Sequence, residues 1–97
     1  MIDGDPKDFI DGLHYGDERW FVFRGTRYFI QGTGSRKDND MMLELWAWQE
    51  DPSGEHAIQF YAKDGKYPVK DFENAKIFDG KSFWEIEHEI QWMDEPM

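Results

Sequence analysis

The stretch Ile77–Asp94, IFDGKSFWEIEHEIQWMD, decides how the chain ends, and two predictions compete for it. Ser82 and Glu85 form the S-x-x-E pattern of a helix N-terminus. At about 100° per residue, four apolar side chains then share one side of that helix: Phe83, Ile86, Ile90 and Met93. From Trp84 to Trp92, however, the residues also alternate without a break in the two-residue period of a strand. We expect a helix packed on a sheet, and a fifth strand is the alternative.

The sheet is predicted from four runs that precede this stretch. Arg19–Phe23 and Thr26–Gln31 are rich in β-branched and aromatic residues and flank a glycine turn, which predicts a hairpin. Met41–Gln49 and His56–Ala62 predict the third and fourth strands, with a loop over residues 32–40. The third strand has two different faces: Leu43, Leu45 and Ala47 lie on one, and Glu44, Trp46 and Trp48 lie on the other.

Helices are predicted before and after these strands. Asp5-Pro6 is typical of a helix start, and Tyr67-Pro68 begins another helix. Their apolar side chains repeat at helical spacing: Phe9, Ile10 and Leu13 in the first, and Val69, Phe72 and Ala75 in the second. The predicted fold is therefore a single small α+β domain over residues 1–97. It is a four-stranded antiparallel meander with an N-terminal helix and two C-terminal helices packed on one face.

The balance of charge is the strongest signal in the composition. The 97 residues include 21 acids and 11 bases, a net charge of −10. Such a surface repels nucleic acids and anionic membranes and attracts basic proteins. The absence of cysteine excludes disulfides and thiolate metal sites. The sequence shows neither a signal peptide nor an apolar run of about 20 residues, so we expect a cytoplasmic protein.

No set of residues predicts catalysis or metal binding. His14, His56 and His88 occur one per predicted element, without the paired spacing of metal ligands. Asp38–Asp40 with Glu44 lacks the glycine and the bidentate glutamate of a calcium loop. None of the serines occupies a nucleophile-elbow motif. We therefore expect no enzyme, no cofactor and no metal.

The remaining signals indicate a protein partner. If the helices cover the leucine face of the third strand, its other face presents tryptophans, which are frequent in binding hot spots. Carboxylates at regular spacing can also mimic the charges along a nucleic acid. The predicted partner-binding residues at the chain end are Glu85, Glu87, Glu89 and Asp94, with Trp84 and Trp92 alongside. Those on the third strand and the loop before it are Glu44, Trp46, Trp48, Asp38 and Asp40. A second acidic group precedes the hairpin: Asp3, Asp5, Asp8, Asp11, Asp17 and Glu18.

Two long segments carry a resemblance. FIDGLHYGDERWFVFRGTRYFIQG near the start and DFENAKIFDGKSFWEIEHEIQW near the end resemble short uncharacterised proteins of bacterial prophages and mobile elements. Small acidic proteins from such elements are frequently inhibitors of host defences, including anti-CRISPR proteins that mimic DNA. The resemblance carries no functional motif, so it implies a class of function and no site residue.

Two functions therefore stand as expectations. The first is a non-enzymatic inhibitor that docks through its acidic face on a basic, nucleic-acid-binding groove, such as that of a CRISPR effector in the host cytoplasm. It would not bind nucleic acid or membranes itself. The alternative is an immunity protein or antitoxin that covers the active site of one cognate toxin.

Overall fold

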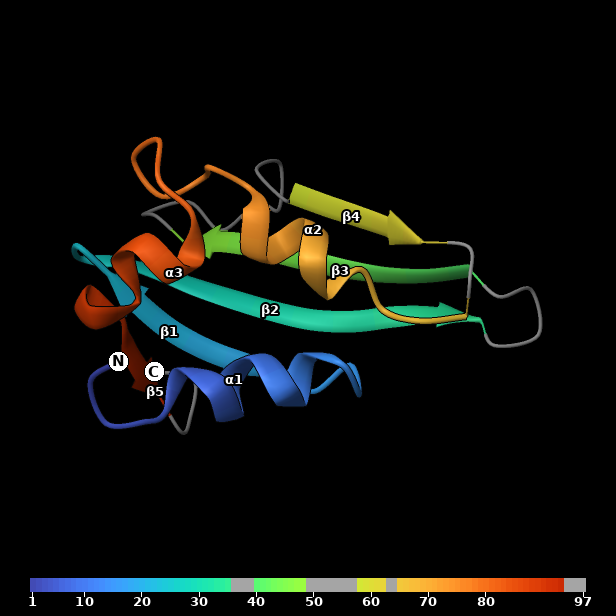
Figure 1. Ribbon diagram of the computed structural model, residues 1–97, viewed down its shortest axis with the longest axis horizontal. Coiled ribbons are helices and arrows are strands. Elements are labelled where there is room, and N and C mark those ends of the chain that lie inside the picture. Colours follow the sequence, from blue (N-terminus) through green and yellow to red (C-terminus); the bar gives the residue numbers. More distant parts are fainter. Residues whose placement is uncertain (36–39, 49–57, 63–64, 94–97) are drawn as a thin grey trace.

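The computed structural model describes residues 1–35, 40–48, 58–62 and 65–93 (Figure 1). Its elements in chain order are α1 (Pro6–Leu13), β1 (Arg19–Phe23), β2 (Thr26–Ser35), β3 (Asp40–Trp48), β4 (Ile58–Ala62), α2 (Val69–Asn74), α3 (Phe83–Ile86), the 3-10 turn η1 (Glu87–Glu89) and β5 (Gln91–Met93). None of the helices in these ranges is long and apolar enough to cross a membrane.

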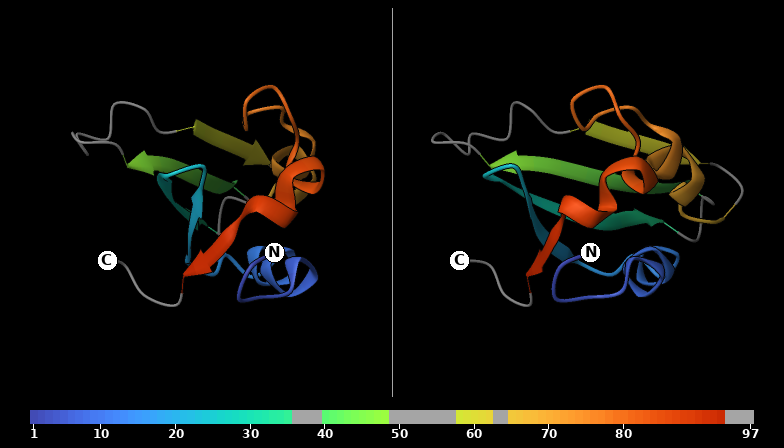
Figure 2. Two further views of the ribbon diagram at one scale, coloured as in Figure 1. Left: turned by 90° about the vertical axis from the view of Figure 1, so that its left-hand side faces the viewer. Right: turned by 60° about the vertical axis from the view of Figure 1, so that its left-hand side comes forward.

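The strands form one antiparallel sheet in the order β4-β3-β2-β1-β5. The first four strands are the predicted meander, and β5 pairs with the other edge of β1. Figures 1 and 2 show α1, α2 and α3 on the same side of this sheet. The predicted α+β fold is thus confirmed, and the alternative fifth strand is present as well.

The stretch that was predicted either as helix or as strand contains both. α3 begins after Ser82 and lasts one turn, η1 follows, and the chain then extends into β5. Phe83, Ile86 and Ile90 are buried, as the helical spacing predicts. Met93 is different, because it lies on β5 and is half-buried.

Backbone hydrogen bonds explain why the helix does not continue to the end of this stretch. Trp20 and Val22 of β1 pair with β5 along one side of the strand. On the other side, the N–H of Ile2 donates to the carbonyl of Ile90 at 2.8 Å, and the N–H of Trp92 donates to the carbonyl of Ile2 at 3.0 Å. The strand thus finds partners on both sides, one of which comes from the start of the chain.

α1 begins as the sequence predicts. The carboxylate of Asp5 accepts a hydrogen bond from the backbone N–H of Lys7 at 2.8 Å, and a proline follows in the first turn. Gly12, which costs a helix about 1 kcal/mol relative to alanine, lies beneath Arg19. A Cβ atom at Gly12 would be 1.8 Å from Nη2 of Arg19. The missing side chain leaves room for the guanidinium, whose carbon lies 5.1 Å from the ring centre of Trp92.

β2 continues four residues beyond its predicted end, through Ser35. The glycines after Gln31 predict a loop because glycine weakens strands. In the fold, the N–H of Gly32 donates to the carbonyl of Gly16 at 3.1 Å. A Cβ atom on Gly32 would lie only 2.4 Å from the Cα of Gly16. Glycine is needed here so that two backbones can meet, and the strand continues past the contact.

Phenylalanine rings fill the space between the helices and the sheet. Phe9 of α1 meets Phe21 of β1 edge-on, with ring centres 5.5 Å apart, and stacks on Phe83 of α3 at 5.4 Å. Phe72 of α2 contacts the same Phe83 at 5.7 Å and Phe78 at 6.3 Å. All five rings are buried. One aromatic cluster therefore attaches the three helices to the sheet.

Candidate protein-binding surface

One face of the sheet carries none of the helices in the described ranges, and we call it the outer face. Strand residues alternate between faces, so the neighbours of the buried Phe21, Ile30, Leu43 and Leu45 point to this outer face. Its apolar side chains come from all five strands: Trp20, Val22, Phe29, Met42, Trp46, Tyr61 and Met93. Tyr61 is exposed and the other six are half-buried. A cross-strand row of Gln31, Glu44 and Gln59 separates Met42 and Tyr61 from the other five. Those five form the larger apolar group, which is a candidate site for another protein.

Aromatic rings cross the middle of the outer face. Trp20 stacks on Phe29 with ring centres 4.3 Å apart, and Phe29 lies opposite Trp46 in the pairing of β2 with β3. The predicted alternation of β3 is correct: Leu43 and Leu45 are buried on the helix side, and Trp46 points away from them. Trp46 is half-buried rather than fully exposed.

The polar groups of the outer face differ between its two ends. At one end, Asp40 is exposed, and its carboxylate has no hydrogen bond or ion pair with any residue that the structure describes. Glu44 lies on the same face of β3, two residues after Met42. Its carboxylate accepts a hydrogen bond from the hydroxyl of Thr33 at 3.2 Å. At the other end lies Arg27.

Two further residues were predicted near this face. Asp38 and the side chain of Trp48 lie outside the described residues. Only the backbone of Trp48 contributes, as the last position of β3, opposite Arg27.

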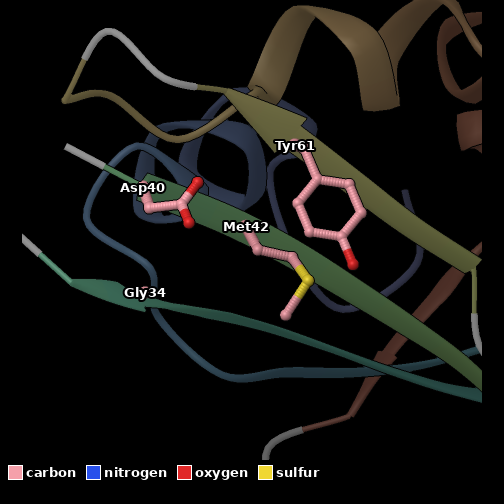
Figure 3. Close-up of a pocket in the computed structure, with 4 residues that line it drawn as sticks. All are labelled: Gly34, Asp40, Met42 and Tyr61. Carbon is pink, nitrogen blue, oxygen red and sulfur yellow. The ribbon is translucent and has the colours of Figure 1, made fainter. Parts of the chain in front are cut away.

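A pocket of about 270 Å³ lies at the Asp40 end of the outer face (Figure 3). Its described walls are Asp40 and Met42 of β3, Tyr61 of β4 and the backbone of Gly34 of β2. Figure 3 shows the three side chains on the same side of their strands. The hydroxyl of Tyr61 donates to Oε1 of Gln59 at 2.7 Å, which holds the ring along β4.

Among the described walls of this pocket, Asp40 alone is predicted from the sequence as a partner-binding residue. Met42 and Tyr61 are not predicted. Met42 could have been found, since the alternation that places Glu44 outward also applies two residues earlier. Tyr61 could not, because its place depends on the register of β4 against β3.

The glutamates of the terminal stretch are each paired with a cation. The pairs are Glu85 with Lys76 at 3.7 Å, Glu87 with the amino group of Met1 at 2.6 Å, and Glu89 with Arg24 at 3.1 Å. The row of carboxylates predicted to bind a partner therefore already has cations within the molecule. Their cations come from other parts of the chain, which is why the local pattern did not reveal them.

These contacts shift the acidity of two of the glutamates. Hydrogen bonds from Arg24, and its charge, lower the pKa of Glu89. In return, hydrogen bonds to Glu89 and then to Asp79 raise the pKa of Arg24. The hydroxyl of Ser82, with a smaller contribution from the charge of Lys76, lowers the pKa of Glu85. Both carboxylates thus serve intramolecular contacts in their ionised form.

The tryptophans of the terminal stretch differ from each other in exposure. Trp84 is 43% exposed, and its Nε1–H donates to Oε2 of Glu73 at 3.2 Å. Trp92 lies on the helix side of the sheet, where it meets the ring of Phe9 edge-on at 5.5 Å. The expectation that Trp92 lies beside an outward row of glutamates is therefore wrong, because β5 turns it toward the core. Asp94 lies outside the described residues.

The second predicted group of acids is more open, and we call residues 3–18 the acidic segment. It contains Asp3, Asp5, Asp8, Asp11, Asp17 and Glu18, which are all exposed. Lys7 is the one lysine or arginine in this range.

Half of these acids have partners within the molecule. Asp5 caps α1, Asp17 pairs with Arg19 at 3.2 Å, and Asp3 accepts a hydrogen bond from Gln91. The other three have no hydrogen bond or ion pair from their side chains to any described residue: Asp8, Asp11 and Glu18. No described residue therefore competes with a partner for these three charges.

The histidines form no catalytic arrangement within the described ranges. A hollow of about 470 Å³ lies beside His14, Tyr67 and Lys70, but no described carboxylate bonds to His14 to orient it as a base. His88 is exposed and approaches Glu89 at 3.9 Å. Among the described residues, no group of three or more acids and histidines is placed to hold a metal ion.

Comparison of the chain with protein-family models, with curated proteins and with solved structures gave no match. A functional proposal for this fold therefore rests on the charges and faces described above.

Proposed function

We propose that this protein is a small, acidic, non-enzymatic inhibitor that binds a basic, nucleic-acid-binding surface of another protein. Its source would be a phage or mobile element, and its partner a host defence protein such as a CRISPR effector. The observation that carries the proposal is the acidic segment, in which six exposed acids and one lysine occur within residues 3–18.

The spacing of these acids suits a nucleic-acid-binding surface. Asp5, Asp8 and Asp11 are three residues apart at the start of α1 and within it. A helix rises about 1.5 Å per residue, so successive charges are about 4.5 Å apart along the axis. Residues three apart also lie on neighbouring positions of one helix side. One strand of a nucleic acid duplex carries a charge about every 3.4 Å, which is close enough for the same basic groove to accommodate both.

The helix itself gains little from this arrangement. Asp8 lies in the first turn of α1, where a negative charge is favourable, but Asp11 lies in the last turn, where it is unfavourable. No basic residue of the last turn compensates for Asp11. Asp8 and Asp11 also repel each other by a few tenths of a kcal/mol. Charges that work against the helix are better explained by a contact outside the molecule.

The glutamates near the end of the chain differ from the acids of residues 3–18 in their contacts within the molecule. Glu85, Glu87 and Glu89 already hold cations of the same molecule. A partner would have to displace those cations to use these charges, whereas Asp8 and Asp11 need no such rearrangement. We therefore assign the electrostatic contact to the acidic segment.

The test is a pull-down from bacterial lysate with the tagged protein, at low salt and at about 0.5 M salt, where exposed charges are screened within about 4 Å. We expect the captured partner to be a nucleic-acid-binding protein that duplex DNA or guide RNA displaces. Salt should weaken the complex steeply.

Two variants with equal net charge locate the contact. Asp8→Asn/Asp11→Asn removes two free charges of the acidic segment, and Glu85→Gln/Glu89→Gln removes two paired ones. The first should weaken capture much more than the second. A complex that survives high salt and ignores nucleic acid contradicts the proposal. If that partner is a toxin whose activity the protein blocks, the alternative function, an immunity protein or antitoxin, is the correct one.

A further inference from the structure

We infer that the pocket lined by Asp40, Met42 and Tyr61 receives an arginine side chain of the partner protein. The basic character of the partner rests on the proposed function, but the choice of arginine comes from the pocket itself. The pocket opens on the outer face, and the acidic segment lies on the helix side of the sheet (Figures 1 and 3). The two sites can therefore be tested separately.

The first requirement of an arginine site is a free carboxylate. Asp40 is exposed and has no hydrogen bond or ion pair with any described residue. Glu44, on the same face, is by contrast engaged by Thr33. A guanidinium binds a carboxylate through two parallel hydrogen bonds, which fixes its plane as well as its position. Asp40 can make this contact without losing one to any residue that the structure describes.

The second requirement is an aromatic surface beside that carboxylate. The ring of Tyr61 is 59% exposed, and its hydrogen bond to Gln59 restricts how it can turn. Tyr61 lies opposite Met42, so it is the diagonal neighbour of Asp40 across the two strands. Diagonal neighbours are about 7–8 Å apart, which leaves room for a planar group between the carboxylate and the ring. A guanidinium stacks on such rings more often than an ammonium does.

The remaining walls suit the stem of the side chain. Met42 presents a flexible thioether between Asp40 and Tyr61, and methionine adapts well to aliphatic partners. Gly34 contributes backbone alone, and a Cβ atom there would lie 2.2 Å from the carbonyl oxygen of Asp40. This side of the pocket therefore stays free of a side chain. The shape favours a long side chain with a flat, charged end, and arginine has both properties.

The experiment measures binding of a blocked peptide, acetyl-Gly-Arg-Gly-amide, to the full chain labelled with ¹³C at its methionine methyl groups. We expect the Met42 signal to shift with millimolar affinity, while Met41, which is buried on the opposite face of the same strand, stays in place. The same peptide with citrulline in place of arginine keeps the shape without the charge, and it should not bind. Binding of the citrulline peptide at equal strength would overturn the inference.

Variants of the pocket walls give the second arm. Asp40→Asn should weaken the arginine peptide about 5-fold, and Tyr61→Leu about 2- to 5-fold. Tyr15→Leu and Asp71→Asn remove another exposed ring and another exposed acid elsewhere, and neither should change the affinity. Unfolding midpoints of all four variants confirm that each one folds. If the control variants weaken binding as much as the pocket variants, the peptide binds the acidic surface in general and the pocket assignment is wrong.

Two further ligands test whether the pocket prefers an arginine side chain within a protein over lysine or free arginine. A lysine peptide should bind more weakly than the arginine peptide, because an ammonium lacks the fork and the flat face. Free L-arginine should also bind more weakly, since its own carboxylate is repelled by Asp40. A stronger response to either would overturn the inference. Loss of partner capture by Asp8→Asn/Asp11→Asn, by contrast, concerns the proposed function and leaves the peptide result unchanged.

Discussion

Arg24 and Glu89 are joined by two hydrogen bonds, 3.1 Å from Nε and 3.2 Å from Nη2, although 65 residues separate them in the sequence. Nη1 of Arg24 also donates to Asp79 at 2.7 Å. Arg24 lies in the turn between β1 and β2 with a positive φ of 47°. One side chain therefore connects the central hairpin with the two segments that flank α3.

This contact predicts how acid affects stability. Because Arg24 lowers the pKa of Glu89 in the folded state, the ionised carboxylate stabilises the fold at a pH above its unfolded pKa of about 4.3. That contribution is lost as the pH falls through the lower pKa of the folded state. Glu89→Gln should therefore reduce the urea midpoint at pH 7 and have little effect near pH 2.

The control for this prediction is Glu18→Gln. Glu18 is exposed and has no hydrogen bond or ion pair from its carboxylate to any described residue. Its replacement should leave the urea midpoint nearly unchanged at both pH values. If Glu89→Gln lowers the midpoint equally at pH 7 and at low pH, the effect is one of packing and the ion pair does not stabilise the fold.

The same contact shows what the sequence could and could not predict. The hairpin, the face of Leu43 and Leu45 and the capped start of α1 follow from local patterns, and the structure has all three. Each depends on neighbours within a few residues. The pairing of Arg24 with Glu89 depends on the register of distant elements, so a reading of the glutamate pattern alone assigns that charge to a partner instead.

The end of the chain illustrates a second limit. Helical and strand periods both fit the residues from Trp84 to Trp92, and the deciding bonds come from Ile2 and from β1. Similarly, Gly32 on its own indicates a loop, but in the fold it lies against the backbone of Gly16 and belongs to β2. In both cases a tertiary contact overrides a local preference.

The charge of Asp11 gives a prediction for the acidic segment. In the last turn of α1 this carboxylate opposes the helix dipole and lies three residues from Asp8. Asp11→Asn should therefore raise the free energy of unfolding by a few tenths of a kcal/mol, and added salt should reduce the gain. Urea denaturation at low and high salt measures both effects.

Asp5→Ala is the matched variant, since it also removes one acid of the same helix. It should lower the stability by about 1 kcal/mol, because Asp5 caps the N–H of Lys7. A stabilising Asp11→Asn together with a destabilising Asp5→Ala separates the acids that serve the fold from those that do not. A loss of stability in Asp11→Asn would remove this support for a function of Asp11 outside the molecule.

The place of Arg19 above Gly12 predicts that two substitutions depend on each other. Alanine normally improves a helix interior by about 1 kcal/mol over glycine. At position 12, however, the Cβ atom of alanine would clash with Nη2 of Arg19. The guanidinium would then have to leave both the ring of Trp92 and the carboxylate of Asp17. Such a contact is worth about 0.5–1 kcal/mol even at an exposed site, and Arg19 and Trp92 are both half-buried. Gly12→Ala should therefore bring little net gain in the natural chain.

A double-mutant cycle measures this dependence. In the background of Arg19→Ala, the guanidinium is absent. Gly12→Ala should there raise the free energy of unfolding by about 1 kcal/mol, with an uncertainty of about 0.5 kcal/mol. Both pairs of variants can be compared by urea denaturation with tryptophan fluorescence. Equal effects of Gly12→Ala in the two backgrounds would show that Arg19 does not occupy this position.

The contact between Gly32 and Gly16 predicts the cost of the smallest side chain at the point where β2 passes the turn after α1. A methyl group on Gly32 would lie 2.4 Å from a backbone atom, which cannot move aside as the end of a flexible side chain can. Gly32→Ala should lower the free energy of unfolding by about 2 kcal/mol or more, as overpacked sites do.

Gly80→Ala is the comparison, because Gly80 has a φ of 78° and no atom within 4 Å of its added Cβ. It should lose only the roughly 1–2 kcal/mol of the left-handed conformation. Urea denaturation measures both free energies. In the NMR spectrum of the folded protein, Gly32→Ala should also shift the backbone amide signals of the turn after α1, whereas Gly80→Ala should shift only signals near residue 80. If Gly32→Ala is the milder of the two and leaves that turn unchanged, the two backbones do not meet at this point and β2 continues through its glycines for another reason.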